Sequence, residues 1–387
     1  MRLNILLFWF MNDWGRFGRT YEMVARHLAR SPKVGRVTCI LPPRMIWNGY
    51  YALPFHVRIE SRKLFVVTPN VRILPKSLFP QKLRHHVNVE LRDRCIARFL
   101  KTMGFSEENT VLWVFPPHGY INKLLNIVPR QILVTQVIDN HLHKTNERAD
   151  FLLFVKNQYE DLARISDLLF VSSRSNLEHF SGKGSSCQLF ENALDDIFLG
   201  HPSELPSRAG TRPRLGYLGW ITQRTDLDLL YFVARERPQY DLHIVGPLEN
   251  SVDLRKTGLL ELPNVTVGKE IPYRDVPGFL ETVDVCLIPH KDTEYSRAMS
   301  PLKLFQYLGS GRPIVSTPVA GIDRWKDFIT IASTSEEFIS KIDEAIRNDT
   351  VEASRARIDT VRQETWTVRV DQMVKAIEEE RFRKTDR

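Results

Sequence analysis

Cysteine is scarce in this 387-residue chain, and its four cysteines lie far apart. They are Cys39, Cys95, Cys187 and Cys286, with no Cys-x-x-Cys spacing among them. Structural zinc sites and small disulfide-rich domains need closely spaced, patterned cysteines. The spacing therefore argues against both, and it predicts free thiols in a reducing compartment.

Long apolar runs are missing as well. The run at the start, Ile5–Met11, has seven residues and is followed by Asn-Asp-Trp-Gly instead of a small-residue cleavage site. A helix needs about 20 apolar residues to span a bilayer, and a secretory signal ends in a cleavage site. We therefore expect a buried first strand here, and a soluble, cytoplasmic protein.

Internal repeats and low-complexity tracts are absent, and the composition is globular, with 43% hydrophobic and 26% charged residues. At this length we expect two domains. The charge is uneven, because residues 1–200 hold 27 Lys and Arg against 17 Asp and Glu, and residues 201–387 hold 27 against 29. A basic first half and a nearly neutral second half indicate different partners for the two halves.

Short apolar segments alternate with helical patterns along both halves of the chain. Strands are predicted at 5–10, 37–41, 64–68, 111–114, 132–137 and 168–171, then at 215–218, 242–245, 265–267, 285–288 and 314–316. Helices are predicted at 20–29, within 82–103, and at 146–165, 174–180, 227–235, 276–281, 301–308 and 336–346. Apolar strands that alternate with helices form parallel sheets covered on both faces. The predicted fold class is therefore α/β, with two Rossmann-like, doubly wound domains.

A segment rich in proline and glycine, residues 200–214, predicts a linker between these domains. The predicted boundaries are a first domain at 1–199, a second domain at 215–365, and a C-terminal helix and tail at 366–387. Ligands of open α/β sheets bind at the carboxyl ends of the strands. Two such domains predict a cleft between them, with one substrate held by each.

The segment SPLKLFQYLGSGRPIVST, residues 300–317, has the marks of an anion-binding helix. Ser300 is a favoured N-cap residue, Pro301 suits the first turn, and Lys303 falls within that turn. The free N–H groups and the positive end of the helix dipole favour an anion, to which Lys303 adds a full charge. An ordinary capped helix of the scaffold remains the alternative from these residues alone.

The same segment resembles the nucleotide-sugar-binding helix of GT-B fold glycosyltransferases, above all bacterial members related to family 4 with Lys-x-x-Gln-Tyr in this helix. The resemblance implies that Ser300, Leu302 and Lys303 bind the donor diphosphate and that Gln306 contacts the ribose. Many relatives carry Glu-x7-Glu in this region, whereas this chain has Met299 and Gln306. This departure leaves the donor sugar open.

Other segments carry the same resemblance, which covers nearly the whole chain. In LGYLGWITQRTDLDLL, Gly219 would let the backbone approach a phosphate, and Arg224 would be a second cation or else a solvated loop residue. The nucleobase pocket and the neighbouring sugar region are implied at Gly268, Lys269, Glu270, Ile271 and His290; for His290 a structural role is the alternative. ETWTVRVDQMVKAIEE resembles the C-terminal helix that crosses back to the first domain, with Trp366 as a packing anchor.

The Asp226-Leu227-Asp228 triplet matches the Asp-x-Asp pattern of metal-dependent glycosyltransferases. It opens an apolar-faced helix, however, where Asp is favoured as a cap. GT-B enzymes generally use the helix dipole and side-chain cations in place of a metal. The resemblance therefore implies no metal and no other cofactor.

The first domain is expected to supply the acceptor site and a general base. ILVTQVIDNHLHKTNE runs from a buried strand into a polar loop, where a carboxylate can take a hydroxyl proton. The resemblance makes Asp139 the predicted base and His141 the second choice; the alternative is that Asp139 caps the following turn. Arg16, Gly18 and Arg19 in NDWGRFGRT would border the acceptor and the donor sugar, and Asn192 in LFENALDDIF corresponds to an Asn of structural role.

Residues 44–86 mix basic and aromatic side chains. Such a surface can contact anionic lipid headgroups from the inner face of the membrane or receive a polyprenyl-linked acceptor. Single-stranded nucleic acid is a rival partner, and a solvated basic face is a further alternative.

The resemblance, together with these patterns, implies a glycosyltransferase that moves a sugar from a UDP-linked donor to a hydroxyl of a glycan or lipid-linked glycan. A catalytically silent binding protein with the same fold is the alternative, and a nucleic-acid-directed protein is a more distant one.

Overall fold

The fold was obtained from a computed structural model, which describes residues 2–9, 13–42, 44–46, 55–72, 81–144, 147–199, 212–319 and 321–386. The expected linker at 200–214 lies mostly outside the described residues. Within the predicted basic, aromatic segment, Trp47, Tyr50, Tyr51, Lys76 and Phe79 are outside them as well. In the described part of the chain, no helix is long and apolar enough to cross a membrane.

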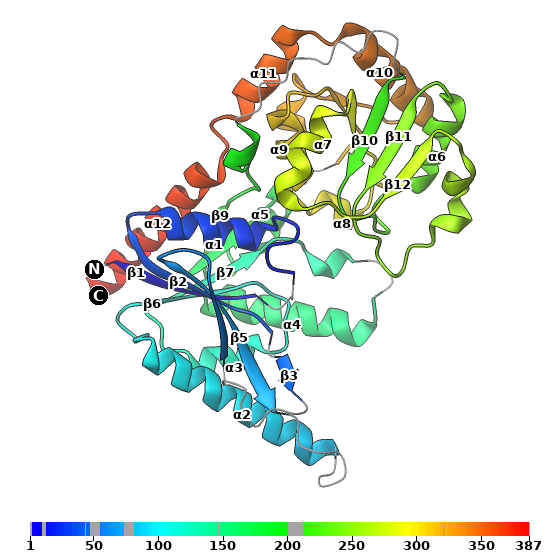
Figure 1. The fold of residues 1–387 in the computed structure, drawn as a ribbon. Helices are drawn as coiled ribbons and strands as arrows, with labels where there is room; N and C mark the ends of the chain where they lie inside the picture. The colour runs from blue at the N-terminus through cyan, green and yellow to red at the C-terminus, as the bar shows by residue number, and fades with distance from the viewer. Residues whose placement is uncertain are drawn as a thin grey trace.

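The first domain is built on a sheet with the strand order β3-β5-β2-β1-β6-β7-β8-β9, and β4 pairs with β5 (Figure 1). Every pairing in it is parallel except β4–β5. Its strands are β1 (Leu3–Phe8), β2 (Val34–Ile40), β3 (Arg44–Ile46), β4 (Phe55–Ile59), β5 (Leu64–Arg72), β6 (Thr110–Val114), β7 (Ile132–Val137), β8 (Leu168–Val171) and β9 (Ser186–Leu189). Its helices are α1 (Thr20–Arg30), α2 (Gln81–Thr102), α3 (Ile121–Ile127), α4 (Ala149–Ile165) and α5 (Arg174–Phe180).

The second domain has a fully parallel sheet with the order β12-β11-β10-β13-β14-β15. Its strands are β10 (Arg214–Leu218), β11 (Asp241–Val245), β12 (Val265–Gly268), β13 (Val285–Ile288), β14 (Ile314–Ser316) and β15 (Thr330–Ile331). Its helices are α6 (Leu227–Glu236), α7 (Val276–Glu281), α8 (Glu294–Arg297), α9 (Leu302–Gly309), α10 (Ser335–Asn348) and α11 (Val351–Val361). The predicted α/β class with two Rossmann-like domains is confirmed.

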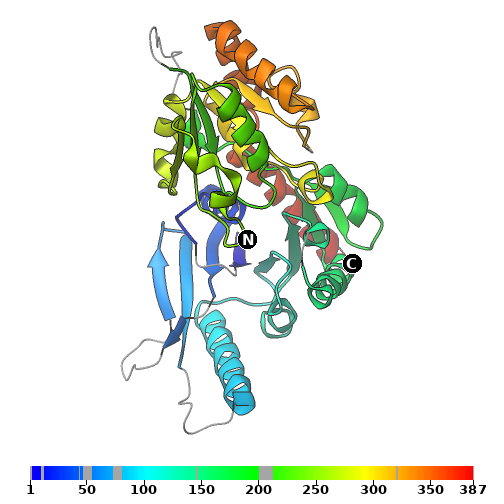
Figure 2. The same cartoon turned by 90° about the vertical axis from the view of Figure 1, so that its right-hand side faces the viewer.

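In both sheets the strand order reverses next to the first strand, between β1 and β6 and between β10 and β13. Such reversal points open a crevice at the carboxyl ends of the strands, where doubly wound folds bind ligands. Apolar clusters cover both faces of each sheet, as continuously apolar strands require. Figure 2 shows the two domains stacked one above the other.

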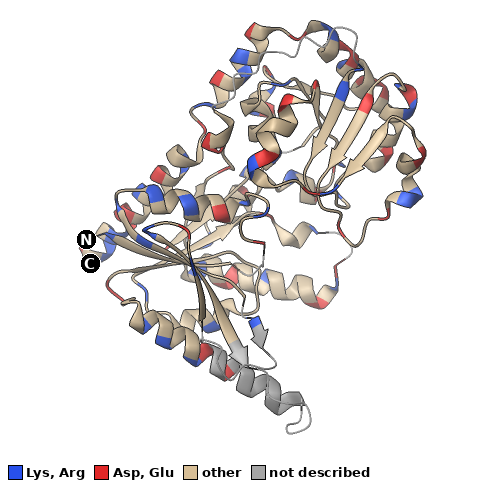
Figure 3. Ribbon diagram, viewed as in Figure 1, with Lys and Arg blue, Asp and Glu red and all other residues tan. Residues whose placement is uncertain are grey.

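The C-terminal helix α12 (Trp366–Thr385) runs back to the first domain and packs along α1. Trp366 is 1% exposed and belongs to the core of the first domain, together with Val370, Met373 and Ile377. This arrangement agrees with the crossing helix expected from the sequence. Figure 3 shows basic and acidic residues interspersed along the helices of both domains.

A histidine, His27, is buried where α1 packs against α12, and burial favours its neutral form. Nδ1 of His27 lies 3.1 Å from Oγ1 of Thr367. Burial, with a smaller effect from Arg30, lowers the pKa of His27 to about 4. The unfolded chain binds a proton at an ordinary histidine pKa of about 6.5, and the folded chain does not until about pH 4.

We therefore expect the free energy of unfolding to fall as the pH drops from about 6.5 toward 4, since the unfolded state takes up more protons in this window. The contribution of His27 is on the order of 3 kcal/mol. Urea denaturation of wild type and His27→Gln over this pH range measures it. The difference between the two curves should shrink as the pH falls; a constant difference would contradict the assignment.

Candidate active site

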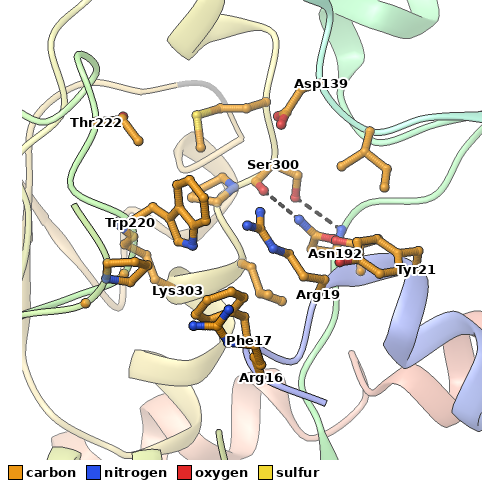
Figure 4. Close-up of a pocket in the computed structure, with 18 of the residues that line it drawn as sticks. Arg16, Phe17, Arg19, Tyr21, Asp139, Asn192, Trp220, Thr222, Ser300 and Lys303 are labelled. Atoms are coloured by element: carbon orange, nitrogen blue, oxygen red, sulfur yellow. Dashed lines mark hydrogen bonds between the residues drawn. The ribbon is translucent and has the colours of Figure 1, made fainter. Parts of the chain in front are cut away.

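A cavity of about 500 Å³ lies between the two sheets. Loops after β1, β6, β7 and β10 to β13 line it, as does the start of α9. Figure 4 shows residues of both domains pointing into it. The cavity brings together most of the residues predicted from the sequence: Arg16, Arg19, Asp139, His141, Gly219, Arg224, Glu270, Ile271, His290, Ser300, Leu302, Lys303 and Gln306.

Lys303 lies in the first turn of α9, with its ammonium packed among groups of the second domain. Nζ is 4.0 Å from the centre of the Tyr217 ring and 3.2 Å from Nε2 of His290. It also lies against the backbone of Gly219, because a Cβ built there would be 3.2 Å from Nζ. Burial lowers the pKa of Lys303. The ammonium thus sits at the carboxyl end of β10, beside the start of a helix.

His290 orients the Lys303 ammonium, and this contact determines the tautomer of the His290 ring. An ammonium only donates hydrogen bonds, so Nε2 of His290 must accept and the neutral ring carries its proton on Nδ1. The side chain is 4% exposed, and burial, then Lys303 and Arg224, lower its pKa well below the usual range. His290 is therefore neutral at pH 7 and holds Lys303 as an acceptor; it does not act as an acid.

Two glycines bring the ends of β10 and β11 together beside Lys303. Gly219 has φ +135° and Gly246 has φ +146°, values that side-chain-bearing residues rarely adopt. A Cβ on Gly246 would lie 2.1 Å from the carbonyl oxygen of Gly219. Gly219 was expected from the sequence. Gly246 was not, although it follows β11 as Gly219 follows β10.

Replacement of Gly246 by alanine should displace the Gly219 turn and weaken nucleoside diphosphate binding by about tenfold or more, because the clash is with backbone that cannot move aside. Calorimetric titration with UDP measures the effect. The matched control is Gly278→Ala in α7, where an added Cβ meets no atom within 4 Å. Equal UDP affinity in both variants would contradict the role of the turn.

Arg224 reaches across the cavity from the second domain toward the first. Its Nη1 is 3.8 Å from Oδ1 of Asp139 and 3.4 Å from the sulfur of Met299, and the guanidinium lies 4.6 Å above the ring of Tyr295. It is not a solvated loop residue, since its side chain is 23% exposed. Among the described residues, no oxygen lies within hydrogen-bonding distance of the guanidinium. Its donors are therefore available to an anionic ligand.

The loop after β7 presents Asp139 to the cavity. Its backbone is held by Tyr159, whose hydroxyl donates to the Asp139 carbonyl at 3.2 Å and accepts from the His141 N–H at 3.3 Å. The turn that follows is capped by Asn140, which accepts from the N–H of Leu142. The alternative that Asp139 is the cap is therefore wrong. Burial lowers the pKa of His141.

Asp226 caps α6, as expected from the sequence. Its side chain accepts from the N–H of Leu229 at the start of α6. The cap accounts for the first Asp of the Asp226-Leu227-Asp228 triplet, so the Asp-x-Asp pattern is weak evidence for a metal site.

The predicted N-cap role of Ser300 is wrong. The helix begins at Leu302, with Pro301 in the cap position and no side-chain cap. Oγ of Ser300 instead accepts from the N–H of Asn192 in the first domain. The Ser300 hydroxyl, which local preference would pair with an N–H of the helix, is therefore bonded to the other domain. The first N–H groups of α9 are left without a side-chain cap, next to Lys303.

The loop after β1 touches the second domain at several points. Arg16 pairs with Glu270, the ring of Phe17 lies 5.9 Å from Trp220, and Arg19 lies 4.7 Å above Trp220. Gly18 faces Tyr273 so closely that a Cβ would overlap its ring. Glu270, expected near the nucleobase, thus has a partner from the first domain. Gly18, Gly268 and Lys269 do not line the cavity.

Several lining residues were not anticipated: Trp9, His118, Gln136, Trp220, Thr222, Gly246 and Tyr273. Trp220 offered a signal, as an aromatic residue directly after the glycine at a strand end. For His118 and Gln136 the sequence offers no such signal, because the residues next to them in the cavity follow other strands.

Two comparisons of sequence match part of the chain. Residues 224–375 match a family model described as Glycosyl transferase-like. Over 131 residues the chain is 30% identical to a Bacillus subtilis (strain 168) protein named "Putative teichuronic acid biosynthesis glycosyltransferase TuaH". That match covers 33% of this chain and 33% of the relative, so it spans a third of the length of each.

Solved structures resemble the whole chain at low identity. Sucrose-phosphate synthase from Thermosynechococcus elongatus has a TM-score of 0.71 at 14% identity, covering 98% of this chain and 99% of that one. An E. coli trehalose-6-phosphate protein bound with UDP-2-fluoro glucose has 0.68 at 10%, covering 98% and 99%. At such identities the likeness establishes the fold. The two sequence matches, over part of the chain, are both to proteins described as glycosyltransferases or glycosyltransferase-like.

Proposed function

We propose that the chain transfers a sugar from a UDP-linked donor to a hydroxyl of a glycan or a lipid-linked glycan. The donor domain would be residues 215–365 and the acceptor domain residues 1–199. The observation that carries the proposal is the position of Lys303, at the uncapped start of α9 and against the Gly219 turn. A cation beside free helix N–H groups is suited to a diphosphate.

In this proposal Lys303, the N–H groups of the α9 start and Arg224 bind the diphosphate, and Gln306 contacts the ribose. Asp139 takes the proton from the acceptor hydroxyl, whose oxygen then bonds to the anomeric carbon. The bond from that carbon to the diphosphate breaks, and the leaving oxygen keeps the electron pair. Lys303 and Arg224 stabilise the charge that develops there.

A panel of nucleotide sugars tests the proposal. Thermal stabilisation selects the donor, and mass spectrometry then follows consumption of the donor with glycan acceptors. Release of UDP with transfer to an acceptor is the expected result. Absence of stabilisation by every nucleotide sugar and by UDP would overturn the proposal.

A catalytically silent binding protein is the second candidate. The observation that favours it is Met299, whose sulfur contacts Arg224 where many relatives carry an acid. Tight binding of a nucleotide sugar with neither transfer nor hydrolysis would select this candidate.

The basic residues of the first half suit an acceptor linked to polyprenyl diphosphate at an anionic membrane. Nucleic acid is the less favoured partner, and its binding would fall steeply with salt and need no nucleotide sugar.

A further inference from the structure

The segment just before α9 belongs to the second domain, yet buried side chains of the first domain hold it. The carbonyl oxygen of Ala298 accepts from Oγ of Ser173 at 3.1 Å and from Nδ2 of Asn176 at 3.2 Å. The carbonyl oxygen of Ser300 accepts from Nδ2 of Asn192 at 2.6 Å. These contacts lie within three to five residues of Lys303 along the chain.

Asn192 is the central member of this set, because its amide has a partner at each end. Oδ1 accepts from Oγ1 of Thr20 at 2.7 Å, and Nδ2 donates to Ser300. Its backbone N–H also donates to the Ser300 hydroxyl at 3.2 Å. Figure 4 shows the two bonds between Asn192 and Ser300. Since the carbonyl oxygen of Ser300 can only accept, the NH₂ group of Asn192 must face Ser300, and Oδ1 is then turned toward the Thr20 hydroxyl, which donates to it.

Thr20 and Asn192 are withdrawn from solvent. Thr20 is 7% exposed and Asn192 is 4% exposed. A buried polar group that loses its hydrogen-bond partner destabilises the fold. Loss of one of these bonds is therefore expected to break the others or to displace the segment before α9. Thr20 is also the first residue of α1 and directly follows the loop that carries Arg16 and Arg19. A chain of hydrogen bonds thus leads from the acceptor-side loop to the start of α9.

We propose that Asn192 is a positioning residue, which sets the start of α9 and thereby Lys303 against the first domain. The donor diphosphate then binds at full strength only when the two domains are docked through Thr20, Asn192 and Ser300. The proposal rests on the phosphate-binding role proposed above for Lys303. Asn192 acts through Ser300, since its own amide is occupied by protein partners.

The contribution of the diphosphate is read from the ratio of UDP affinity to uridine affinity, measured by calorimetry. Thr20→Val keeps the shape of the side chain and removes the hydroxyl that orients Asn192. We expect it to weaken UDP binding about threefold to tenfold, the usual effect of one hydrogen bond, and to leave uridine binding unchanged. Thr20→Ser restores the hydroxyl and should restore the ratio. Asn192→Ala removes both side-chain bonds and should lower the ratio further.

Thr135→Val is the matched control. Thr135 is a fully buried threonine of β7 whose Oγ1 lies 2.7 Å from Oγ of Ser166, so its loss removes a comparable bond within the first domain. We expect this control to be less stable in thermal melts yet to keep the wild-type ratio. A fall of the ratio in the control as large as in Thr20→Val would mean general destabilisation and would overturn the inference.

The inference and the proposed function fail in different ways. If Lys303→Ala lowers the ratio while Thr20→Val and Asn192→Ala do not, the positioning role is wrong and the donor site stands. If wild-type protein binds UDP no better than uridine, and the same holds for GDP with guanosine and ADP with adenosine, the proposed function falls and the inference falls with it.

Discussion

Replacement of Lys303 by alanine should lower the affinity for UDP by at least about a hundredfold. Hydrogen bonds to charged groups contribute about 1.5–3 kcal/mol each, and a partly buried ammonium can make more than one to a diphosphate. No other lysine lines the cavity in the described part of the chain, so none can substitute. Isothermal titration with UDP measures the loss.

Lys326→Ala is the control for Lys303→Ala, since Lys326 is an exposed lysine of the same domain. It should leave UDP affinity unchanged. His290→Gln, which offers an amide oxygen to the ammonium in place of Nε2, should bind UDP better than His290→Leu. Wild-type UDP affinity in Lys303→Ala would remove Lys303 from the donor site.

Asp139→Asn should lower the rate of transfer by about 10² to 10⁴ and leave donor binding intact. The amide keeps the shape of the side chain but cannot take a proton, and general bases contribute rate factors of this size. Loss of the carboxylate also frees Arg224 from its neighbour at 3.8 Å, so UDP affinity should stay equal or rise. Single-turnover transfer assays and calorimetry on the same preparation separate the two effects.

Asp161→Asn provides the control for the general base, because Asp161 is an exposed residue of α4 paired with Arg164. Its transfer rate should match wild type. Full activity in Asp139→Asn would exclude Asp139 as the base and make His141, in the same loop, the next candidate. Equal losses of UDP binding and of transfer would mean that Asp139 supports the donor site instead.

The sheet strands were predictable because their signal is local. The segments 132–137, 168–171, 285–288 and 314–316 were predicted with the bounds that the structure has. Each is buried throughout and consists mainly of apolar residues, as a strand covered on both faces requires. The strand β4 was not predicted, since four of its five residues are exposed and, among the described residues, it pairs with the antiparallel β5 alone. An exposed edge strand has no continuous apolar pattern to detect.

The candidate site was predictable where strand ends define it. Gly219, Asp139 and His290 each follow a buried strand, and parallel sheets bring such positions to one edge. Ser300 was misassigned for the opposite reason: its partner, Asn192, is 108 residues away in the sequence. The pair of Arg16 and Glu270 joins loops from different domains in the same way. No local preference encodes either contact.

The sequence by itself determined the fold class, the parallel strands of the two sheets and the strand ends that face the cleft. It did so because apolar periodicity and turn residues act within a few positions of the chain. Only the tertiary structure decided which side chains meet across the cleft. Thr20, Asn192 and Ser300 form one hydrogen-bonded chain because the two domains dock at that point. Lys303 lies against Gly219 because β10 ends, and α9 begins, at the same edge of the sheet. The docking of two domains buries polar groups that must then find partners, and those partners depend on the arrangement of the whole chain.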